Sequence, residues 1–217
     1  MELYYHPLSS YCWKALIALY ENATPFEPRM LEDPAVAGEW MALWPIGRFP
    51  VLRDGDRVIA ETSVIIEYLG QRHPGPFVPI PADPDFAIEV RLMDRLFDNY
   101  VMGSLQTVVF EKVRPEGANR DPYGVEQARL FLAKSYDLIE ARIAGRAWAA
   151  GEDFSLADCA ALPALYYCDY IVPFRATHPN LGAYIARLEA RPSVARVLAE
   201  MRPWFHHFPF ADAKADI

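Results

Sequence analysis

The sequence is poor in cysteine and contains neither a long apolar run nor a cluster of basic residues. Three cysteines in 217 residues argue against a disulfide framework. No window approaches the ~18 uninterrupted apolar residues of a transmembrane helix, so we expect no membrane span. The formal net charge of −8, without a run of Lys and Arg, disfavours binding to nucleic acids or to anionic membranes.

Histidine is also scarce, and its placement does not indicate a metal site. His206 and His207 are adjacent, which is a poor spacing for chelation on one face of a helix, and the other histidines are scattered. We therefore expect no bound metal. Residues 1–12 mix polar and aromatic types instead of forming the apolar core of a secretory signal, so we expect a cytoplasmic protein.

The first 75 residues alternate short strands with helices. Apolar spacing predicts strands at 2–5 and 26–30, a helix at 12–20, an irregular helical connection at 34–44 and a helix at 63–71 that Thr62 caps. The turn signal Asp54-Gly55-Asp56 separates two apolar runs, at 50–52 and 57–60, and predicts a β-hairpin. The resulting order βαβαββα predicts a small α/β domain over residues 1–75.

A proline-rich segment follows this domain. Pro74, Pro76, Pro79, Pro81 and Pro84 fall within eleven residues, where a helix cannot persist. We therefore assign residues 76–85 to a linker. Apolar residues then recur at helical spacing in segments at 88–105, 125–143, 155 onward, 181–190 and 194–201. Residues 86–217 are thus expected to form an all-helical second domain.

The motif Ser9-Ser10-Tyr11-Cys12 stands between the first strand and the first helix. Ser9 is either the N-cap of that helix or a hydroxyl that donates to a bound thiolate, and the two roles are compatible. Lowering the pKa of a thiol by ~2 units from ~8.5 requires about 2.7 kcal/mol. A hydrogen bond to a charged group contributes ~1.5–3 kcal/mol and a helix N-terminus ~0.3–1 kcal/mol, which together are about enough.

Cys12 is the rival sulfur in this motif. Redox chemistry with two cysteines needs a partner, and the matching position 9 is serine. A cysteine one turn inside a helix usually behaves as a small buried hydrophobe. We therefore expect Cys12, like Cys159 and Cys168, to lie in the core, and the site to hold a thiolate that a ligand supplies.

Two further segments can bind an extended ligand. Pro50 precedes a strand, and a cis bond there would expose the backbone of Val51 for pairing with a peptide, whereas a trans bond would be an ordinary strand entry. Arg48 can bind a carboxylate or be solvated. Glu61 and Thr62 form either a helix N-cap with an acidic neighbour or a site for a ligand's carboxylate and ammonium groups.

Four motifs in this order make the chain resemble a cytosolic glutathione transferase. They are S-S-Y-C followed by W-K-A-L-I-A-L, G-R-F-P-V-L, E-T-S-V-I-I-E-Y-L and S-L-A-D-C. The N-terminal motifs are most similar to the serine-type branch, which includes zeta, tau and bacterial relatives. The resemblance covers essentially the whole chain. It implies a thioredoxin-like first domain, an all-α helical-bundle second domain, a homodimer, and an activity that joins glutathione to small hydrophobic electrophiles, as in detoxification.

The resemblance also implies residue roles. Ser9 would be the catalytic residue that stabilises the glutathione thiolate. The backbone of Val51 would pair with the cysteinyl part of glutathione, and Arg48 would lie near its glycyl carboxylate. The Ser155-to-Asp158 segment would be a structural capping box. The glutathione-binding residues expected in full are Ser10, Arg48, Pro50, Val51, Glu61 and Thr62.

Several positions depart from the family pattern. Thr62 replaces the usual serine and keeps the hydroxyl, and Trp44 replaces a common asparagine. Tyr11 stands where the zeta pattern has a small residue or cysteine, which counts against a zeta-type isomerase. Tyr5 falls where tyrosine-type members carry their catalytic hydroxyl. We favour Ser9 over Tyr5 because Ser9 lies at the helix start, whereas Tyr5 lies inside the strand.

The second substrate is expected between the domains, against the first long helix of the second domain. Its expected contacts are Tyr11, Phe97, Tyr100 and Val101, each of which could instead pack in the core. The aromatic segment 204–210 would fold over this pocket or cover the core. Glutathione transfer is the leading hypothesis. The alternatives are isomerisation or peroxide reduction at the same site, and a non-catalytic binding protein that kept the fold.

Overall fold

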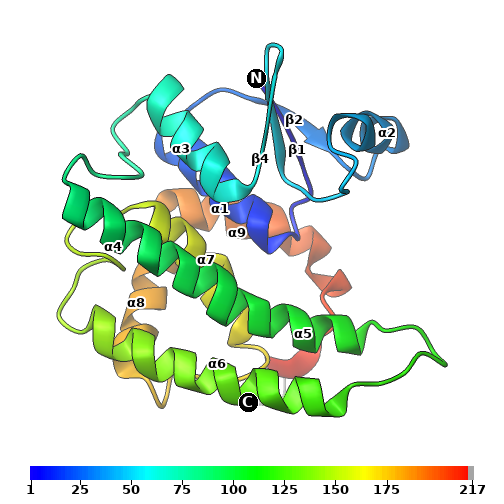
Figure 1. The fold of residues 1–217 in the computed structure, drawn as a ribbon, viewed down its shortest axis with the longest axis vertical. Helices are drawn as coiled ribbons and strands as arrows, with labels where there is room; N and C mark the ends of the chain where they lie inside the picture. Colours follow the sequence, from blue (N-terminus) through cyan, green and yellow to red (C-terminus); the bar gives the residue numbers. More distant parts are fainter. Residues whose placement is uncertain (215–217) are drawn as a thin grey trace.

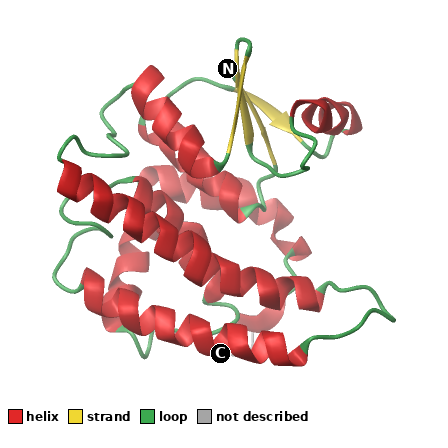
Figure 2. Cartoon of the chain, in the orientation of Figure 1, coloured by secondary structure: helices red, strands yellow, loops and turns green. Residues whose placement is uncertain are grey.

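A four-stranded mixed sheet forms the centre of the first domain in the computed structural model, which describes residues 1–214 (Figures 1 and 2). Its strands are β1 (Glu2–Tyr5), β2 (Glu27–Met30), β3 (Val51–Asp54) and β4 (Arg57–Ala60), in the spatial order β2-β1-β3-β4. β1 and β2 are parallel, and β3 pairs antiparallel with both β1 and β4. Gly55, with a φ of 59°, begins the two-residue turn of the β3–β4 hairpin.

Helices cover both faces of this sheet because side chains alternate along β1. Leu3 and Tyr5 belong to the main core, on the face covered by α1 (Ser10–Glu21) and α3 (Thr62–Arg72). Tyr4 points to the other face and packs with Val36 of α2 (Pro34–Leu43). The predicted order βαβαββα is confirmed.

Among the described residues after α3, the chain folds into helices. α4 (Pro84–Arg95) continues into a π-helical segment (Leu96–Met102) and α5 (Gly103–Lys112), and α6 (Pro122–Ile143) runs beside them (Figure 1). α7 (Leu156–Cys168), α8 (Pro179–Glu189), α9 (Pro192–Met201) and short 3₁₀ turns at Arg202–His207 and Ala211–Lys214 follow. In the part of the chain that the structure describes, no helix is long and apolar enough to cross a bilayer.

The π-helical segment changes one expectation from the sequence. The apolar stripe at 88–105 predicts one regular helix with a single buried face, but Ile88 and Leu92 on α4 are 65% and 40% exposed. A π turn inserts an extra residue and rotates the side chains that follow it, so the two halves of the stripe do not share a face. Such turns often mark functional sites.

The two domains share one core through α1 and α7. Trp13 of α1 is fully buried and packs on the rings of Tyr166 and Tyr167 of α7. Its indole N–H donates to the carbonyl of Pro7 at 2.6 Å, which satisfies the group that a buried tryptophan must pair. This bond fixes the segment that leads from β1 into α1.

The expected capping unit begins α7. Asp158 is fully buried and accepts from the backbone N–H of Ser155 at 2.8 Å and from the Ser155 hydroxyl at 3.0 Å. The N–H of Ala149 and the hydroxyl of Tyr184 donate to its other oxygen at 2.8 and 2.6 Å. A buried carboxylate with four donors is fully satisfied, so its role here is structural.

Candidate active site

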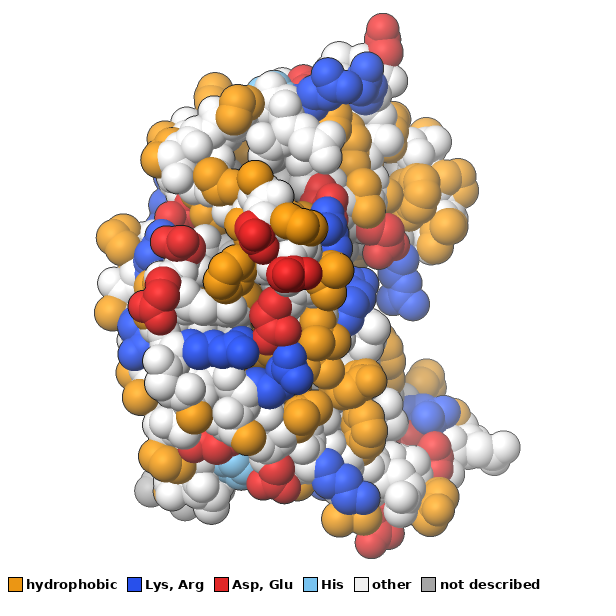
Figure 3. All heavy atoms as spheres, turned by 60° about the vertical axis from the view of Figure 1, so that its left-hand side comes forward, with side chains coloured by type: hydrophobic (Ala, Val, Ile, Leu, Met, Phe, Trp, Pro, Cys, Tyr) orange, Lys and Arg blue, Asp and Glu red, His pale blue; other side chains and the backbone are white. Residues whose placement is uncertain are grey.

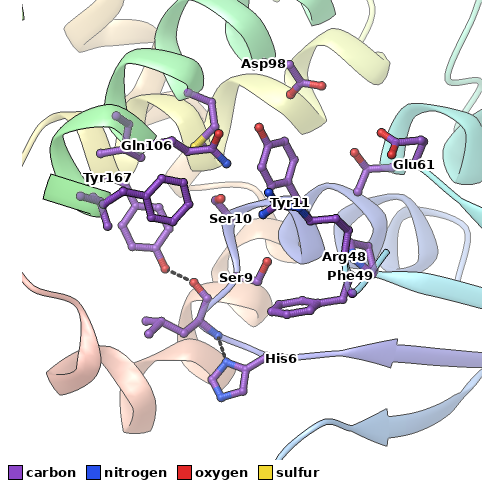
Figure 4. Close-up of a pocket in the computed structure, with 18 of the residues that line it drawn as sticks. His6, Ser9, Ser10, Tyr11, Arg48, Phe49, Glu61, Asp98, Gln106 and Tyr167 are labelled. Carbon is purple, nitrogen blue, oxygen red and sulfur yellow. Dashed lines mark hydrogen bonds between the residues drawn. The ribbon is translucent and has the colours of Figure 1, made fainter. Parts of the chain in front are cut away.

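A cavity of about 660 Å³ lies between the two domains at the N-terminus of α1 (Figure 4). The first domain contributes the loop before α1, the segment before β3 and the start of α3. The second contributes the π-helical segment, α5, α7 and the chain after α9. The expected site residues that line it are Ser9, Ser10, Arg48, Pro50, Glu61 and Thr62.

Ser9 occupies the N-cap position of α1, but its hydroxyl does not cap the helix. Its backbone is extended, its carbonyl accepts from the N–H of Trp13 at 3.2 Å, and its side chain makes no capping hydrogen bond. The first N–H groups of α1 have no intrahelical acceptor. A negative group beside Ser9 would therefore meet both a hydroxyl and a helix N-terminus.

Hydrogen bonds from both domains hold the loop before Ser9 (Figure 4). Tyr167 of α7 donates its hydroxyl to the carbonyl of Leu8 at 2.6 Å, and the N–H of Leu8 donates to Nδ1 of His6 at 3.1 Å. The N–H of Ser9 donates to the His6 carbonyl at 3.0 Å, and His6 Nε2 lies 2.8 Å from a Glu32 oxygen. These bonds hold the backbone of Leu8 and Ser9 at the start of α1.

Cys12 and Tyr5, the alternatives that the sequence offers to Ser9, do not line the cavity. Cys12 is fully buried, and burial raises the pKa of its thiol to about 12 despite a smaller opposing effect of the Ser9 hydroxyl. Tyr5 does not line the cavity, and burial together with the charge of Glu200 raises its pKa. The geometry therefore favours Ser9. Cys12, Cys159 and Cys168 are all buried, as the sequence predicts.

The Phe49–Pro50 peptide bond is cis, and both residues line the cavity. Val51 does not line it, in contrast to the expectation from the sequence. This residue is fully buried and begins β3, where it pairs with Tyr4 on one side and Ala60 on the other. The residues of this turn that line the cavity are Arg48, Phe49 and Pro50, which precede the ladder.

Arg48 lies at the mouth of the cavity with an exposed side chain. Trp40 of α2 donates its indole N–H to the Arg48 carbonyl at 3.0 Å and meets the Phe49 ring edge-on, with the ring centroids 5.6 Å apart. These contacts fix the backbone of the turn while the guanidinium stays accessible to a carboxylate.

Glu61 has a strained backbone at the start of α3. Its φ of 67° and ψ of 116° are rare for an L-residue and cost of order 1–3 kcal/mol. Glu61 occupies the N-cap position without capping through its side chain, and Thr62 is the first helical residue, which corrects the expectation that Thr62 caps α3. Strain of this kind clusters at ligand sites, so this helix start is a candidate anion site.

A buried cluster of charges joins the domains beside this helix start. Lys14 is 1% exposed, and its Nζ donates to Asp94 Oδ1 at 2.8 Å and to Asp98 Oδ2 at 2.6 Å. The Ser63 hydroxyl donates to Asp94 at 2.8 Å, and Arg95 donates to Asp98 at 3.0 Å. Burial raises the pKa of Asp98 and the neighbouring Lys14 opposes that shift. Asp98 and Arg95 also line the cavity.

The second-domain wall of the cavity is mostly apolar. Its apolar side chains come from α5, the residue before it and the C-terminal segment, and they are Met102, Leu105, Val109, Phe110, Phe208 and Pro209. Phe208 and Pro209 confirm that the aromatic segment 204–210 folds back to the pocket. Of the contacts expected for a second substrate, Tyr11 lines the cavity, and burial raises its pKa to about 12.

The other three expected contacts are elsewhere. Phe97 and Val101 are fully buried in the core, and Tyr100 is 41% exposed outside the cavity. The expectation was wrong because it assumed a regular helix through the π-helical segment. The spacing of Met102, Leu105 and Val109, taken alone, would have predicted one helical face.

Sequence reasoning also missed His6, Asp98, Gln106 and Tyr167, which line the cavity. These residues come from four separate segments and belong to no local motif, so only the folded chain brings them together. Among the described residues, no group of three or more His, Cys, Asp or Glu side chains is arranged to hold a metal ion.

Known families match both parts of the chain. Residues 3–77 match the glutathione S-transferase N-terminal domain, and residues 123–187 match the glutathione S-transferase C-terminal domain. FtsZ-localized protein A from Caulobacter vibrioides (strain NA1000 / CB15N) is 30% identical over 211 residues, which cover 93% of this chain and 92% of that protein. The chain belongs to the glutathione S-transferase family.

Other members of the glutathione S-transferase family support the same conclusion. Glutathione S-transferase 3 from Zea mays is 28% identical over 207 residues, covering 92% of this chain and 93% of that protein. The structure of a glutathione S-transferase from Methylobacillus flagellatus KT with glutathione bound has a TM-score of 0.82 and 28% identity, covering 90% of this chain and 98% of that chain. The thioredoxin-like first domain and all-helical second domain are confirmed, and a glutathione-transferase-like function is supported at the level of the family.

Proposed function

We propose that this protein activates the thiol of glutathione and transfers glutathione to a hydrophobic electrophilic small molecule. The observation that carries the proposal is the Ser9 hydroxyl, which lines the interdomain cavity at the first turn of α1 and is not used to cap that helix. A hydrogen bond and a helix N-terminus at one point both favour a thiolate. This placement supports a serine-type mechanism, similar to that of the zeta, tau and bacterial relatives.

The tripeptide would lie along the first-domain side of the cavity. Its sulfur would lie beside Ser9 and Ser10, both of which line the cavity. Its cysteinyl backbone would pair with the backbone of Phe49, next to the cis bond to Pro50, in place of the Val51 contact that the sequence predicts.

The two ends of glutathione would meet groups of opposite charge. The γ-glutamyl carboxylate would accept from the first N–H groups of α3 and from the Thr62 hydroxyl, and the ammonium would pair with Glu61. The glycyl carboxylate would pair with Arg48 at the cavity mouth. The electrophile would bind against the apolar wall, so that the site holds both reactants together and lowers the entropic cost of their encounter.

Glutathione binding and turnover test this proposal. A ligand at 100 times its Kd stabilises the fold by about 2.7 kcal/mol, which for a chain of this size raises Tm by about 5–10 °C. We expect glutathione to produce such a rise, and oxidised glutathione a smaller one. Turnover of benzyl chloride, followed by chloride release, should depend on glutathione. No stabilisation and no turnover would reject the proposal.

Replacing Glu61 with glycine should separate backbone strain from charge. Glycine adopts a φ of 67° without steric cost, so Glu61→Gly is expected to raise the free energy of unfolding by about 1 kcal/mol. It removes the partner of the ligand ammonium, so the Kd for glutathione should rise about tenfold. Urea unfolding and calorimetry measure the two effects. Glu61→Gln, which keeps the strain, should weaken binding without stabilising the fold.

A non-catalytic binding protein is the second candidate, and one observation favours it. The relative at 30% identity is named for its localisation with FtsZ, not for a transferase reaction. In that case glutathione would still raise Tm while no electrophile is consumed. Glutathione-dependent isomerisation or peroxide reduction would use the same thiolate, and product analysis distinguishes both from transfer.

We also propose a homodimer in the cytoplasm. Large apolar side chains are exposed on neighbouring helices, and Figure 3 shows hydrophobic groups among charged ones on the face that includes the left-hand side of Figure 1. The exposed apolar residues of α3, α4, the π-helical segment and α6 include Val64, Ile88, Leu92, Tyr100, Phe131 and Leu138. Exposed apolar side chains on several helices suit association between copies. Sedimentation equilibrium should give twice the mass of the chain, and a monomer would contradict this.

A further inference from the structure

Gln106 is the one carboxamide that α5 presents to the cavity. Figure 4 shows its side chain extending from α5 into the space bordered by Ser10 and Tyr11. It is half-buried, and its neighbours at helical spacing on the same wall, Met102 and Val109, are apolar. Within residues 1–214, no hydrogen bond joins the Gln106 side chain to another protein group.

The side-chain amide of Gln106 is therefore partly buried without a hydrogen-bond partner from the part of the protein that the structure describes. A partly desolvated amide costs free energy unless water or a ligand pairs with it. The other polar side chains of the cavity are placed differently. Arg95 and Asp98 pair with each other, Arg48 is at the mouth, and Glu61 belongs to the first-domain side. Asn99, the other carboxamide that lines the cavity, is exposed on the π-helical segment. Gln106 is therefore a polar group in the apolar half of the cavity that remains available to the second substrate.

We propose that Gln106 is a specificity-determining residue that donates Nε2–H to an acceptor oxygen of the electrophile, and that the preferred electrophiles are conjugated carbonyl compounds. The inference rests on the proposed glutathione activation. An amide can present either its N–H or its oxygen, because rotation of the side chain exchanges them. Attack by a thiolate places negative charge on the electrophile, and this charge selects the N–H donor.

The reaction balances without a further co-reactant. The glutathione thiolate attacks the β-carbon of the enone, and the new S–C bond forms as the C=C π pair shifts to give an enolate. The Gln106 amide donates to the enolate oxygen while the negative charge resides there. The α-carbon then takes a proton from water, and the proton released when the thiol ionised restores the balance. The product is a saturated thioether.

A pair of substrates that share a phenyl ring tests the assignment. Benzylideneacetone carries the conjugated carbonyl, whereas benzyl chloride has no acceptor oxygen and loses chloride. Gln106→Leu keeps the size of the side chain and removes the donor. We expect kcat/KM for benzylideneacetone to fall about tenfold more than kcat/KM for benzyl chloride, because only benzylideneacetone loses a hydrogen bond to a developing charge.

Two further variants sharpen the comparison. Gln127→Leu makes the same change at an exposed position of α6 outside the cavity, and should leave the ratio of the two activities unchanged. Gln106→His retains an N–H donor and should recover part of the benzylideneacetone activity.

The outcomes separate this inference from the proposed function. An equal effect of Gln106→Leu on both substrates, or no effect, would overturn the role of Gln106. Turnover of benzyl chloride alone by the unaltered protein would reject the substrate class and leave the proposed function standing. Turnover of neither substrate would reject both.

Discussion

Replacing Ser9 with alanine should lower kcat/KM for glutathione transfer about 10- to 50-fold near pH 6.5. The hydroxyl and the start of α1 together can lower the pKa of the bound thiol by about 2 units, from ~8.5 to ~6.5. Half of the bound thiol is then ionised near pH 6.5. Without the hydroxyl most of this shift disappears, and only a few per cent of the thiol is ionised at the same pH.

The sign of the pH dependence distinguishes this role from a structural one. Near pH 9 the thiol ionises in both proteins, so the loss in Ser9→Ala should shrink to less than about threefold. In Ser9→Ala, the apparent pKa of the pH profile of kcat/KM should therefore be 1–2 units higher than in the unaltered protein. One charged hydrogen bond supplies roughly this shift. A titration of the bound thiolate by its ultraviolet absorbance measures the same shift directly.

Tyr5→Phe provides the matched control. The Tyr5 hydroxyl lies outside the cavity, so its removal should leave kcat/KM and the pH profile unchanged. An unchanged profile in Ser9→Ala together with a shifted profile in Tyr5→Phe would transfer the catalytic role to Tyr5. A uniform loss at all pH values in Ser9→Ala would indicate misplaced glutathione in place of lost thiolate stabilisation.

Replacing Lys14 with methionine should lower the free energy of unfolding by about 3–5 kcal/mol. Lys14 and Asp94 are 1% and 2% exposed, and Lys14 lies within 2.8 Å of both Asp94 and Asp98. Methionine matches the shape of the lysine stem but leaves two carboxylates buried with less compensation. Breaking a buried ion pair from one side carries a penalty of this size because the remaining charge cannot recover its hydration.

A double-mutant cycle separates this charge effect from packing. Asp94→Asn in the Lys14→Met background removes one of the two carboxylates that have lost Lys14, and Arg95 still pairs with the other, Asp98. The double variant should therefore recover about 1 kcal/mol relative to Lys14→Met alone. Lys134→Met, at an exposed position of α6, should change stability by no more than about 0.5 kcal/mol. Urea unfolding measures these variants together with the Asp94→Asn single variant, which completes the cycle. Additive losses in the cycle would show that the cluster is not coupled.

Local signals in the sequence were sufficient for the first domain. The short apolar segments at 2–5 and 26–30, the Asp54-Gly55-Asp56 turn and the order of the elements predicted the strands and the hairpin correctly. Ser9 could be identified as a candidate because a hydroxyl at a helix start has a defined electrostatic environment whatever surrounds it. Phe49–Pro50 could be named as a possible cis bond but not assigned, since the chain surrounding a proline decides between the two isomers.

The second-domain residues that line the cavity could not be predicted from such local signals. The sequence placed Phe97 and Val101 against the second substrate, whereas the structure buries both and brings Met102 and Gln106 to the cavity. A π turn rotates every later side chain of the helix, and its position depends on packing with other helices, so periodicity along one segment does not reveal it.

The sequence by itself determined the order of elements, the candidate site at the start of α1 and the structural role of the Ser155-to-Asp158 unit, because these depend on neighbours within a few residues. The tertiary structure decided that Tyr5 and Cys12 lie outside the site, that Phe49 borders it in place of Val51, and that Lys14 joins the domains through Asp94 and Asp98. These outcomes depend on burial and on contacts between segments far apart in the chain, and such contacts are fixed only when the two domains share one core.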